Sequence, residues 1–268
     1  MSAAQRILVK VGGAILDDPE TRASFAASVA DTRARGSSVV VVHGGGAQVT
    51  RLTDALGLEP VRIRGLRVTD DATARAVLQV LAGEVNAILV AALQRAGASA
   101  VGLSGADGGL FDADVADAAL GHVGVVSRVD ASILDALGGA GYVPVVSTVT
   151  PAGDGSDVFL NVNADAAVAP LAAAWRADAV LFLSDVPHVR DGDARVPAID
   201  RSAFTALEAS EAIVGGMIPK VGAALAAAES LPEATVRIAS GSERDAISAA
   251  LDPSRGTRVF AAIEEVEA

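Results

Sequence analysis

Three charged residues in this 268-residue chain have the types and the sequence settings that suit phosphoryl transfer. Lys10 lies inside an otherwise apolar run, residues 6–11, where an unpaired ammonium would be costly. Lys220 follows a glycine turn at residues 215–216 and opens an alanine-rich stretch, and Asp165 lies between the two lysines in the sequence. Two ammonium groups can neutralise a moving phosphoryl group while a carboxylate holds them in place. The three residues therefore predict a phosphotransferase site.

Three glycine-rich turns follow predicted strands and should lie at the carboxyl edge of one sheet, where open parallel sheets bind ligands. They cover residues 12–13, 43–46 and 104–109. Glycine lets backbone N–H groups approach an anion closely, and a following helix adds its positive end. A glycine after a strand is more often only a turn, but three such turns favour a phosphate-binding edge. The common GxxxxGK[ST] and GxGxxG nucleotide motifs are both absent.

Short β-branched runs alternate with alanine-rich stretches, which is typical of a parallel sheet with helices on both faces. Strands are expected at residues 6–11, 38–42, 99–103, 142–147, 179–184, 235–238 and 257–261. A helix is expected from Pro19, with Asp18 as its N-cap, to a stop at Gly36. Further helices are expected at residues 48–56, 164–175 and 221–230. Residues 121–129 and 148–160 predict a hairpin-rich insertion.

These elements predict an α/β fold, a three-layer αβα sandwich with an open, mainly parallel sheet. We expect two lobes, residues 1–176 and residues 177–268. Just before the boundary, Asn161 and Asn163 would point the same way on an extended segment. Asn163 would then cap the following helix and place Asp165 in its first turn.

The composition narrows the class of protein. Hydrophobic residues make up 51% of the chain, enough for a core, and the absence of cysteine excludes disulfides, thiolate metal sites and a cysteine nucleophile. The formal net charge of -12 argues against binding nucleic acid or an anionic membrane through the overall field. No uninterrupted apolar stretch reaches the roughly 18 residues of a spanning helix, and the N-terminus does not look like an export signal. We therefore expect a cytoplasmic protein.

Several motifs resemble those of the N-acetylglutamate kinases in the amino acid kinase superfamily. They are Lys10-Val-Gly-Gly, His43-Gly-Gly-Gly, Gly65-Leu-Arg-Val-Thr-Asp70, Gly83-Glu-Val-Asn86, Leu103-Ser-Gly-Ala-Asp-Gly108, Leu160-Asn-Val-Asn-Ala-Asp165 and Gly215-Gly-Met-Ile-Pro-Lys220. The resemblance runs from about residue 7 to residue 261, in the family's order and spacing. GLRVTD together with NVNAD is specific to this branch, whereas the lysine–glycine start is shared by the whole superfamily.

The resemblance implies the amino acid kinase fold, also called carbamate kinase-like, and ATP-dependent phosphorylation of the side-chain carboxylate of N-acetyl-L-glutamate, the second step of arginine biosynthesis. It assigns transition-state stabilisation to Lys10 and Lys220, and their organisation to Asp165. Substrate contacts are implied for Gly45, Gly46, Arg67 and Asn161, and nucleotide contacts for Gly12, Gly13, Ser184, Asp185, Gly215, Gly216 and Met217. Magnesium should arrive with ATP and need few protein ligands. The N-terminal lobe should take the acyl substrate and the dimer contact, and the C-terminal lobe ATP.

The residue types agree with this chemistry. A carboxylate is already ionised at neutral pH and is its own nucleophile, so the reaction needs no general base. His43 lies nearest the predicted site, and packing or loop anchoring at the strand end is its favoured role. Arg67 suits a carboxylate because its guanidinium is a planar fork.

Two departures from the family pattern affect the expected details. His188 stands where the family usually has glycine, which leaves the adenine pocket open to question. At most five residues precede the first strand, so the extra N-terminal helix of arginine-inhibited hexamers is missing, and we expect a homodimer insensitive to arginine.

Two other functions stay open. The first is a kinase of aminoadipate or glutamate attached to a small acidic carrier protein, against which the acidic net charge weighs. The second is a non-catalytic amino-acid sensor on the same fold, against which the presence of both lysines and Asp165 weighs.

Overall fold

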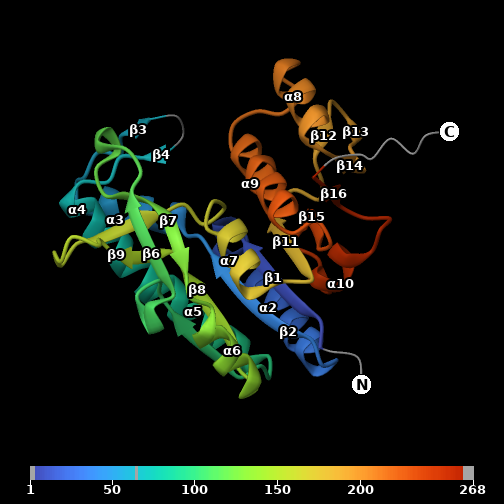
Figure 1. Cartoon of the computed structure of the whole chain (residues 1–268), viewed down its shortest axis with the longest axis horizontal. Coiled ribbons are helices and arrows are strands. Elements are labelled where there is room, and N and C mark those ends of the chain that lie inside the picture. Colours follow the sequence, from blue (N-terminus) through green and yellow to red (C-terminus); the bar gives the residue numbers. More distant parts are fainter. Residues whose placement is uncertain (1–3, 64–65, 262–268) are drawn as a thin grey trace.

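The centre of the molecule is an eight-stranded sheet, seen in a computed structural model that describes residues 4–63 and 66–261 (Figure 1). Every neighbouring pair of strands is parallel except β15 with β16. The predicted open, mainly parallel sheet is confirmed, and each expected strand is present. In spatial order the strands are β14 (Ala198–Ile199), β16 (Thr257–Val259), β15 (Thr235–Ser240), β11 (Ala179–Ser184), β1 (Arg6–Val11), β2 (Ser38–His43), β8 (Val143–Ser147) and β5 (Ala100–Leu103).

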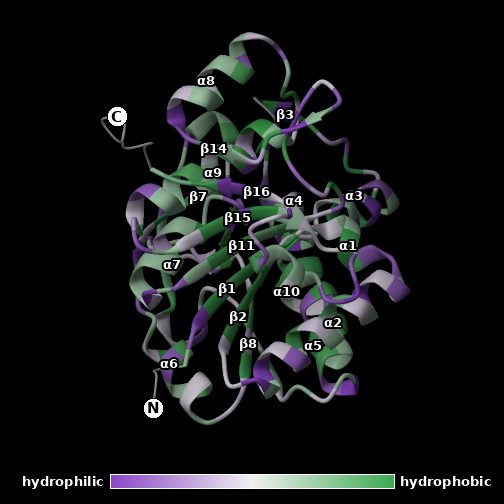
Figure 2. Cartoon of the chain, turned by 90° about the vertical axis from the view of Figure 1, so that its right-hand side faces the viewer, coloured by the Kyte–Doolittle hydropathy of each residue, from purple (hydrophilic) through white to green (hydrophobic). Residues whose placement is uncertain are grey.

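Helices cover both faces of this sheet and complete the three layers of the sandwich (Figure 2). Alternate side chains of β1 enter two separate cores, Val9 and Val11 on one face and Leu8 on the other. Lys10 therefore projects toward the same face as Leu8. The first face is covered by α2 (Pro19–Ala34), α5 (Asn86–Arg95) and α10 (Ala246–Leu251), and the second by α6 (Ser132–Gly139), α7 (Val168–Trp175) and α9 (Met217–Ser230).

The helix ends follow local side-chain chemistry. The start of α2 is as predicted, with Asp18 as N-cap, and Gly36 follows its end with φ of 95°. The predicted start of α7 is wrong, because this helix begins at Val168 rather than at residue 164. The side chain of Asn163 accepts a hydrogen bond from the backbone N–H of Asp165 at 2.8 Å. This bond has the form of an N-cap, and the Ala167 N–H donates to the Asn163 carbonyl at 3.0 Å, but residues 164–167 form a turn, so Asp165 lies before the regular helix and not in its first turn.

A second, four-stranded sheet confirms the predicted hairpin-rich insertion. Its order is β6 (Phe111–Val115), β7 (Val123–Val129), β10 (Phe159–Val162) and β9 (Val149–Pro151). Two small hairpins pair β3 (Arg62–Ile63) with β4 (Leu66–Arg67), and β12 (Arg190–Asp191) with β13 (Ala194–Arg195).

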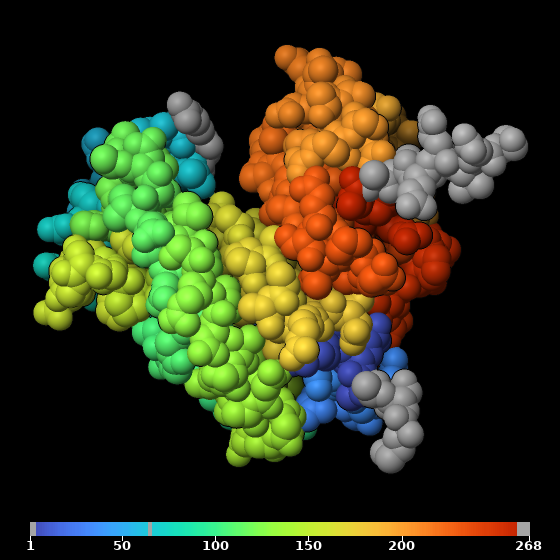
Figure 3. Space-filling model, viewed as in Figure 1, coloured from blue at the N-terminus to red at the C-terminus, as the bar shows by residue number. Residues whose placement is uncertain are grey.

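A cleft separates two parts of the molecular surface. Figure 3 shows it between the part that carries the second sheet and the part that carries α8 (Arg201–Ala209) and α9. The boundary between the two predicted lobes, residues 1–176 and residues 177–268, stays a prediction.

One continuous helix, Asp71–Arg95, is long and apolar enough to cross a membrane by length and composition alone. In the sequence, Gly83 and Glu84 interrupt the apolar run of this helix, so no spanning segment was predicted there. It is built from α4 (Asp71–Leu78), a π-helical stretch (Gln79–Val85) and α5. Half of its most apolar window is buried inside the protein, where residues such as Leu89 and Leu93 belong to the first core.

Candidate active site

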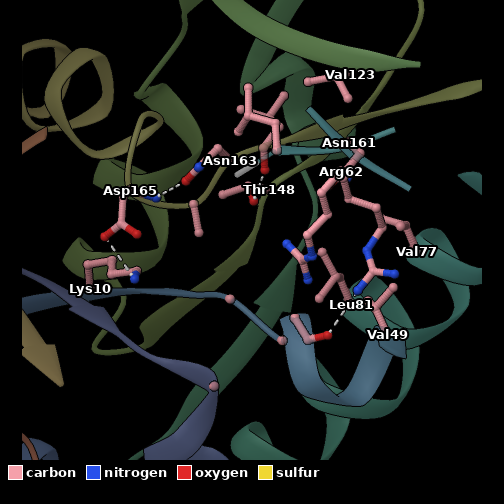
Figure 4. A pocket seen from close by; sticks show the side chains of 18 residues that line it. Lys10, Val49, Arg62, Val77, Leu81, Val123, Thr148, Asn161, Asn163 and Asp165 are labelled. Carbon is pink, nitrogen blue, oxygen red and sulfur yellow. Dashed lines mark hydrogen bonds and ion pairs between the residues drawn. The ribbon is translucent and has the colours of Figure 1, made fainter. Parts of the chain in front are cut away.

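A cavity of about 280 Å³ lies beside the carboxyl ends of β1 and β2, between the main sheet and the second sheet (Figure 4). Its walls combine aliphatic side chains, glycines and polar side chains. Figure 4 shows Lys10 with Asp165 at one end and Arg62 at the other, and Arg67, the register partner of Arg62, also lines the cavity. The polar side chains that line the cavity are Lys10, Arg62, Arg67, Thr148, Asn161, Asn163 and Asp165.

Lys10 is buried and paired. Only 6% of the residue is exposed, and its Nζ lies 2.8 Å from Asp165 Oδ1. The backbone N–H of Asp165 donates to the side chain of Asn163. This hydrogen bond fixes the backbone of Asp165 and so helps to position its carboxylate for the ion pair. The two residues come from distant parts of the sequence, and the structure brings them together as expected.

Lys220 reaches the same charge cluster from the other side of the cleft. It lies in the first turn of α9, half-buried. Burial lowers its pKa and the ammonium of Lys10 lowers it further, whereas Asp165 and Asp185 act in the opposite direction. Lys10 and Lys220 are the only two lysines in the whole sequence, against 19 arginines. Lys10 thus forms an ion pair with Asp165, and Lys220 interacts electrostatically with the same carboxylate.

The first two glycine turns pack directly against each other. A Cβ on Gly45 would lie 2.6 Å from the Cδ2 of Leu81, and a Cβ on Gly13 would lie 3.4 Å from the Cα of Gly45. A side chain at Gly45 would require Leu81 to move, whereas at Gly13 the neighbouring Gln48 side chain would have to shift only slightly. Gln48 ties the two turns together, because its Nε2 donates to the Gly13 carbonyl at 3.2 Å. Sequence reasoning missed Gln48, whose only signal was a polar side chain in a helix just after the turn.

The helix α3 (Gly46–Ala55) begins at the cavity. No side chain caps its first turn, and Gly44, Gly45 and Gly46 all line the cavity. The N–H groups of its first turn and the positive end of its dipole are therefore available to an anion. The N–H of Gly12 is already donated to the carbonyl of Leu183 at 3.1 Å. Gly12 can therefore assist a nucleotide only through its missing side chain.

Within residues 4–63 and 66–261, no carboxylate forms a salt bridge with the positively charged Arg67. It is 8% exposed, and its Nη2 donates to Thr50 Oγ1 at 2.5 Å and to the Gly46 carbonyl at 3.4 Å. Its Nη1 is buried without a hydrogen-bond partner. Burial lowers the pKa of Arg67, and the neighbouring Arg62 lowers it further. A buried guanidinium in this state calls for an anionic ligand.

The rest of the GLRVTD motif positions its neighbours, although Gly65 lies outside the described residues. Thr69 accepts a hydrogen bond from Asn161 Nδ2 at 3.2 Å and donates one to the Arg67 carbonyl at 3.0 Å. Asp70 caps α4 by accepting from the Thr73 backbone N–H at 2.8 Å. The motif therefore links the two predicted substrate-binding side chains through one threonine.

His43 has the anchoring role expected for it. It is fully buried, and burial lowers its pKa to about 4. Its Nε2 lies 3.0 Å from Asn86 Nδ2 and its Nδ1 lies 3.0 Å from the Gly44 carbonyl, so the neutral ring accepts from the amide and donates to the turn. Asn86 also donates to the Val145 carbonyl at 2.9 Å. The pair locks the second glycine turn to the sheet.

This burial makes the stability of the protein depend on pH. A histidine whose pKa falls from 6.5 to about 4 on folding is neutral in the folded state and protonated in the unfolded state between those values. We therefore expect the free energy of unfolding to be complete above pH 6.5 and to lose about 3 kcal/mol as the pH falls toward 4. Urea unfolding of the wild type and of His43→Gln across this range measures the difference. An equal loss in both proteins would contradict this assignment.

Of the predicted nucleotide residues, only Gly13 lines the cavity, and those that lie near Lys220 in the chain or in the sheet are outside it. Ser184 ends β11, Gly215 has a φ of 57° in the turn before α9, and Gly216 is the N-cap of that helix. The third glycine turn, residues 104–109, does not join them. It follows the edge strand β5, Asp107 caps it through Ser104, and it does not line the cavity. All three turns do follow parallel strands of one sheet, as expected, but a part for this third turn in phosphate binding stays a prediction.

The donors present suit a magnesium ion that arrives with phosphate groups. In the described part of the chain, no group of three His, Asp or Glu side chains is close enough to hold a metal ion. The carboxylates nearest to Lys220 are Asp165 and Asp185, and the first of these is already paired with Lys10. Such a site can supply at most an occasional ligand to a magnesium ion whose coordination comes mainly from phosphates and water.

Comparisons with known proteins agree with the sequence motifs. The model of the family described as "Amino acid kinase family" matches residues 5–240. The acetylglutamate kinase of Solibacter usitatus is 44% identical over 248 residues, which cover 90% of this chain and 93% of that protein. The acetylglutamate kinase of Methanopyrus kandleri is 43% identical over 234 residues, with coverage of 83% and 90%.

Solved structures confirm the fold class. The protein smu.665 of Streptococcus mutans superposes with a TM-score of 0.84 at 24% identity and covers 96% of this chain and 99% of that chain. The carbamate kinase of Giardia lamblia bound to AMP-PNP superposes with a TM-score of 0.70 at 18% identity, with coverage of 98% and 100%. At these identities the likeness establishes the fold alone.

Proposed function

Because this chain belongs to the amino acid kinase family, and within it to the acetylglutamate kinases, we infer that it phosphorylates the side-chain carboxylate of N-acetyl-L-glutamate with ATP. The products are N-acetyl-L-glutamyl 5-phosphate and ADP, and the reaction belongs to arginine biosynthesis. Nothing in the structure favours a carrier-bound substrate or a sensor without activity.

One observation supports this function above the others. The cavity has an unneutralised guanidinium, Arg67, at one end and an ammonium–carboxylate pair, Lys10 with Asp165, at the other. A substrate with two carboxylates suits such a cavity, because one carboxylate can bind Arg67 while the other faces the ammonium groups. The aliphatic side chains in the walls between them suit a methylene chain and an acetyl group.

The chain's own residues then account for the transfer. A carboxylate oxygen of the substrate forms a bond to the γ-phosphorus of ATP, and the bond from that phosphorus to the β–γ bridging oxygen breaks. Negative charge develops on the equatorial and leaving oxygens. Lys10 and Lys220 would stabilise that charge, and Asp165 would hold the two ammonium groups apart at a fixed position. The N–H groups of Gly45 and Gly46 would face the transferring group from the start of α3.

The nucleotide would bind on the α9 side of the cleft. Lys220 and the uncapped start of α9 supply positive charge there. The proposed contacts are Gly12, Gly13, Ser184, Asp185, Gly215, Gly216 and Met217. Magnesium, carried by ATP, would neutralise phosphate oxygens when bound. Residues 1–176 would then hold the acyl substrate, and residues 177–268 the nucleotide.

We also propose that the protein is a cytoplasmic homodimer. The outer face of the Asp71–Arg95 helix exposes Ile88 at 39%, and Tyr142 is 40% exposed beside the edge strand β5. A second copy would cover this apolar face, and it belongs to the part of the chain expected to make the dimer contact. Light scattering on the purified protein is expected to give twice the chain mass of 26.7 kDa. A mass equal to one chain would contradict the dimer.

A hydroxamate assay tests the function directly. Purified protein is incubated with Mg-ATP, hydroxylamine and one of three acids, N-acetyl-L-glutamate, L-glutamate or 2-aminoadipate. Hydroxylamine converts an acyl phosphate into a coloured hydroxamate, so the signal reports the reaction itself. We expect signal with N-acetyl-L-glutamate alone. Silence with all three acids would point to a carrier-bound substrate or to a sensor.

A further inference from the structure

Two arginines stand opposite each other at one end of the cavity, and the proposed function uses only one of them. Arg62 on β3 and Arg67 on β4 are register partners in an antiparallel pair. Both residues line the cavity, and Figure 4 shows Arg62 at the end of the cavity away from Lys10 and Asp165. Like charges placed directly opposite each other across two strands are destabilising. The hairpin therefore carries an electrostatic cost that faces the cavity.

The surroundings of Arg67 do not remove this cost. Its hydrogen bonds go to a hydroxyl and a carbonyl, both uncharged, and its Nη1 is buried without a partner. The pKa of Arg67 is lowered first by burial and then by Arg62, while Asp54 alone acts in the opposite direction. An anion bound between the two guanidiniums would relieve both the desolvation of Arg67 and the repulsion from Arg62.

The location of the pair matters because the chain as a whole is acidic. A net charge of -12 repels a dicarboxylate, so the substrate needs a local positive region to approach and bind. We propose that Arg62 is a second contact for the α-carboxylate of the substrate, which binds between Arg62 and Arg67. A carboxylate has lone pairs enough to accept from two guanidiniums. This inference rests on the proposed function. It explains how the enzyme would select a substrate that has a free α-carboxylate.

Replacing Arg62 is expected to weaken substrate binding and to leave the chemical step intact. Arg62→Gln should raise KM for N-acetyl-L-glutamate about 10- to 100-fold with kcat within about twofold, as for a lost charged hydrogen bond. The wild type should discriminate strongly against N-acetyl-L-isoglutamine, which has an amide in place of the α-carboxylate. This discrimination, as a ratio of kcat/KM values, should fall at least about tenfold in Arg62→Gln.

The unliganded protein gives a second readout. Arg62→Gln removes the repulsion between Arg62 and Arg67 across the two strands, so its Tm should stay within about 2 °C of the wild type while KM rises. Arg62→Glu places a glutamate opposite Arg67, where it forms an attractive pair, and it should abolish binding of N-acetyl-L-glutamate. Arg128→Gln is the matched control, since Arg128 on β7 faces Asp112 across an antiparallel pair, with Nε 2.6 Å from Oδ2. Its Tm should stay or fall, and its KM should not change.

Several results would overturn the assignment of Arg62. An unchanged KM in Arg62→Gln would exclude the contact, and a parallel loss of Tm and kcat would indicate a structural role instead. Absence of turnover by the wild type with N-acetyl-L-glutamate would overturn the proposed function by itself. In that case the rise in Tm on adding N-acetyl-L-glutamate still tests the arginine pair. A rise that is equal in wild type and Arg62→Gln, or absent from both, would reject this inference too.

Discussion

Lys220→Met is expected to lower kcat about 10³-fold, while KM for N-acetyl-L-glutamate stays within about threefold. Burial and the nearby Lys10 lower the pKa of Lys220, so this ammonium is held in the cleft at a cost to the folded protein. Such a group contributes most when negative charge develops opposite it, which occurs in the transition state of phosphoryl transfer. The hydroxamate assay at saturating Mg-ATP measures the loss.

Stability measurements separate this effect from unfolding. Methionine keeps much of the aliphatic stem of Lys220 and removes a charge that burial disfavours, so the Tm of Lys220→Met should stay or rise. Lys10→Met provides the contrast, because it leaves the partly buried Asp165 without its 2.8 Å partner and should lower both kcat and Tm. Retention of more than about a tenth of wild-type kcat in Lys220→Met would remove this lysine from the catalytic set.

The fold was largely predictable because its signals are local. Runs such as residues 39–42 are apolar throughout, as is typical of strands covered on both faces, and each of them became a strand of the main sheet. The start of α7 was not predictable in this way. Helix propensity favours residues 164–167, and Asn163 accepts the backbone N–H of Asp165 as an N-cap would, but these residues form a turn and the regular helix begins only at Val168.

The central charges of the site were predictable because their settings are unusual in sequence. A lysine inside an apolar strand and a lysine after a glycine turn both needed a partner, and Asp165 is paired with the first and lies close enough to raise the pKa of the second. The supporting residues gave weaker signals. Gln48 and Asn86 are polar residues on helices, and their burial against the glycine turn and the sheet depends on tertiary packing.

Arg62 shows a further limit of sequence reasoning. In the sequence, Arg62 lies close to other arginines, a pattern that is typical of a solvated surface. The sequence does not show that Arg62 and Arg67 lie on two paired strands. The antiparallel register places Arg62 opposite Arg67 and turns both toward the cavity. The third glycine turn, residues 104–109, is the opposite case, because it looked like a ligand-binding turn in the sequence and does not line the cavity. Its composition favours a ligand, but β5 lies at the edge of the sheet, away from the cavity.

Asp165→Asn is expected to lower kcat about 10²-fold at pH 8 and to move the alkaline limb of the kcat profile to lower pH. Asp165 raises the pKa of Lys220 against the lowering by burial and by Lys10. Without this carboxylate the pKa of Lys220 falls further, so less of it is protonated at any pH above that value. Activity that needs the ammonium form is then lost first at alkaline pH and partly regained as the pH is lowered.

Asp185→Asn is the matched control for this profile. Asp185 also raises the pKa of Lys220, but more weakly than Asp165, and it is exposed. Its alkaline limb should therefore move in the same direction by a smaller amount, with little change in kcat near neutral pH. If Asp165→Asn lowers kcat equally at every pH, the carboxylate acts by fixing the position of Lys10 through their ion pair. The pH profile therefore decides whether Asp165 works on the charge of Lys220 or only on the geometry of Lys10.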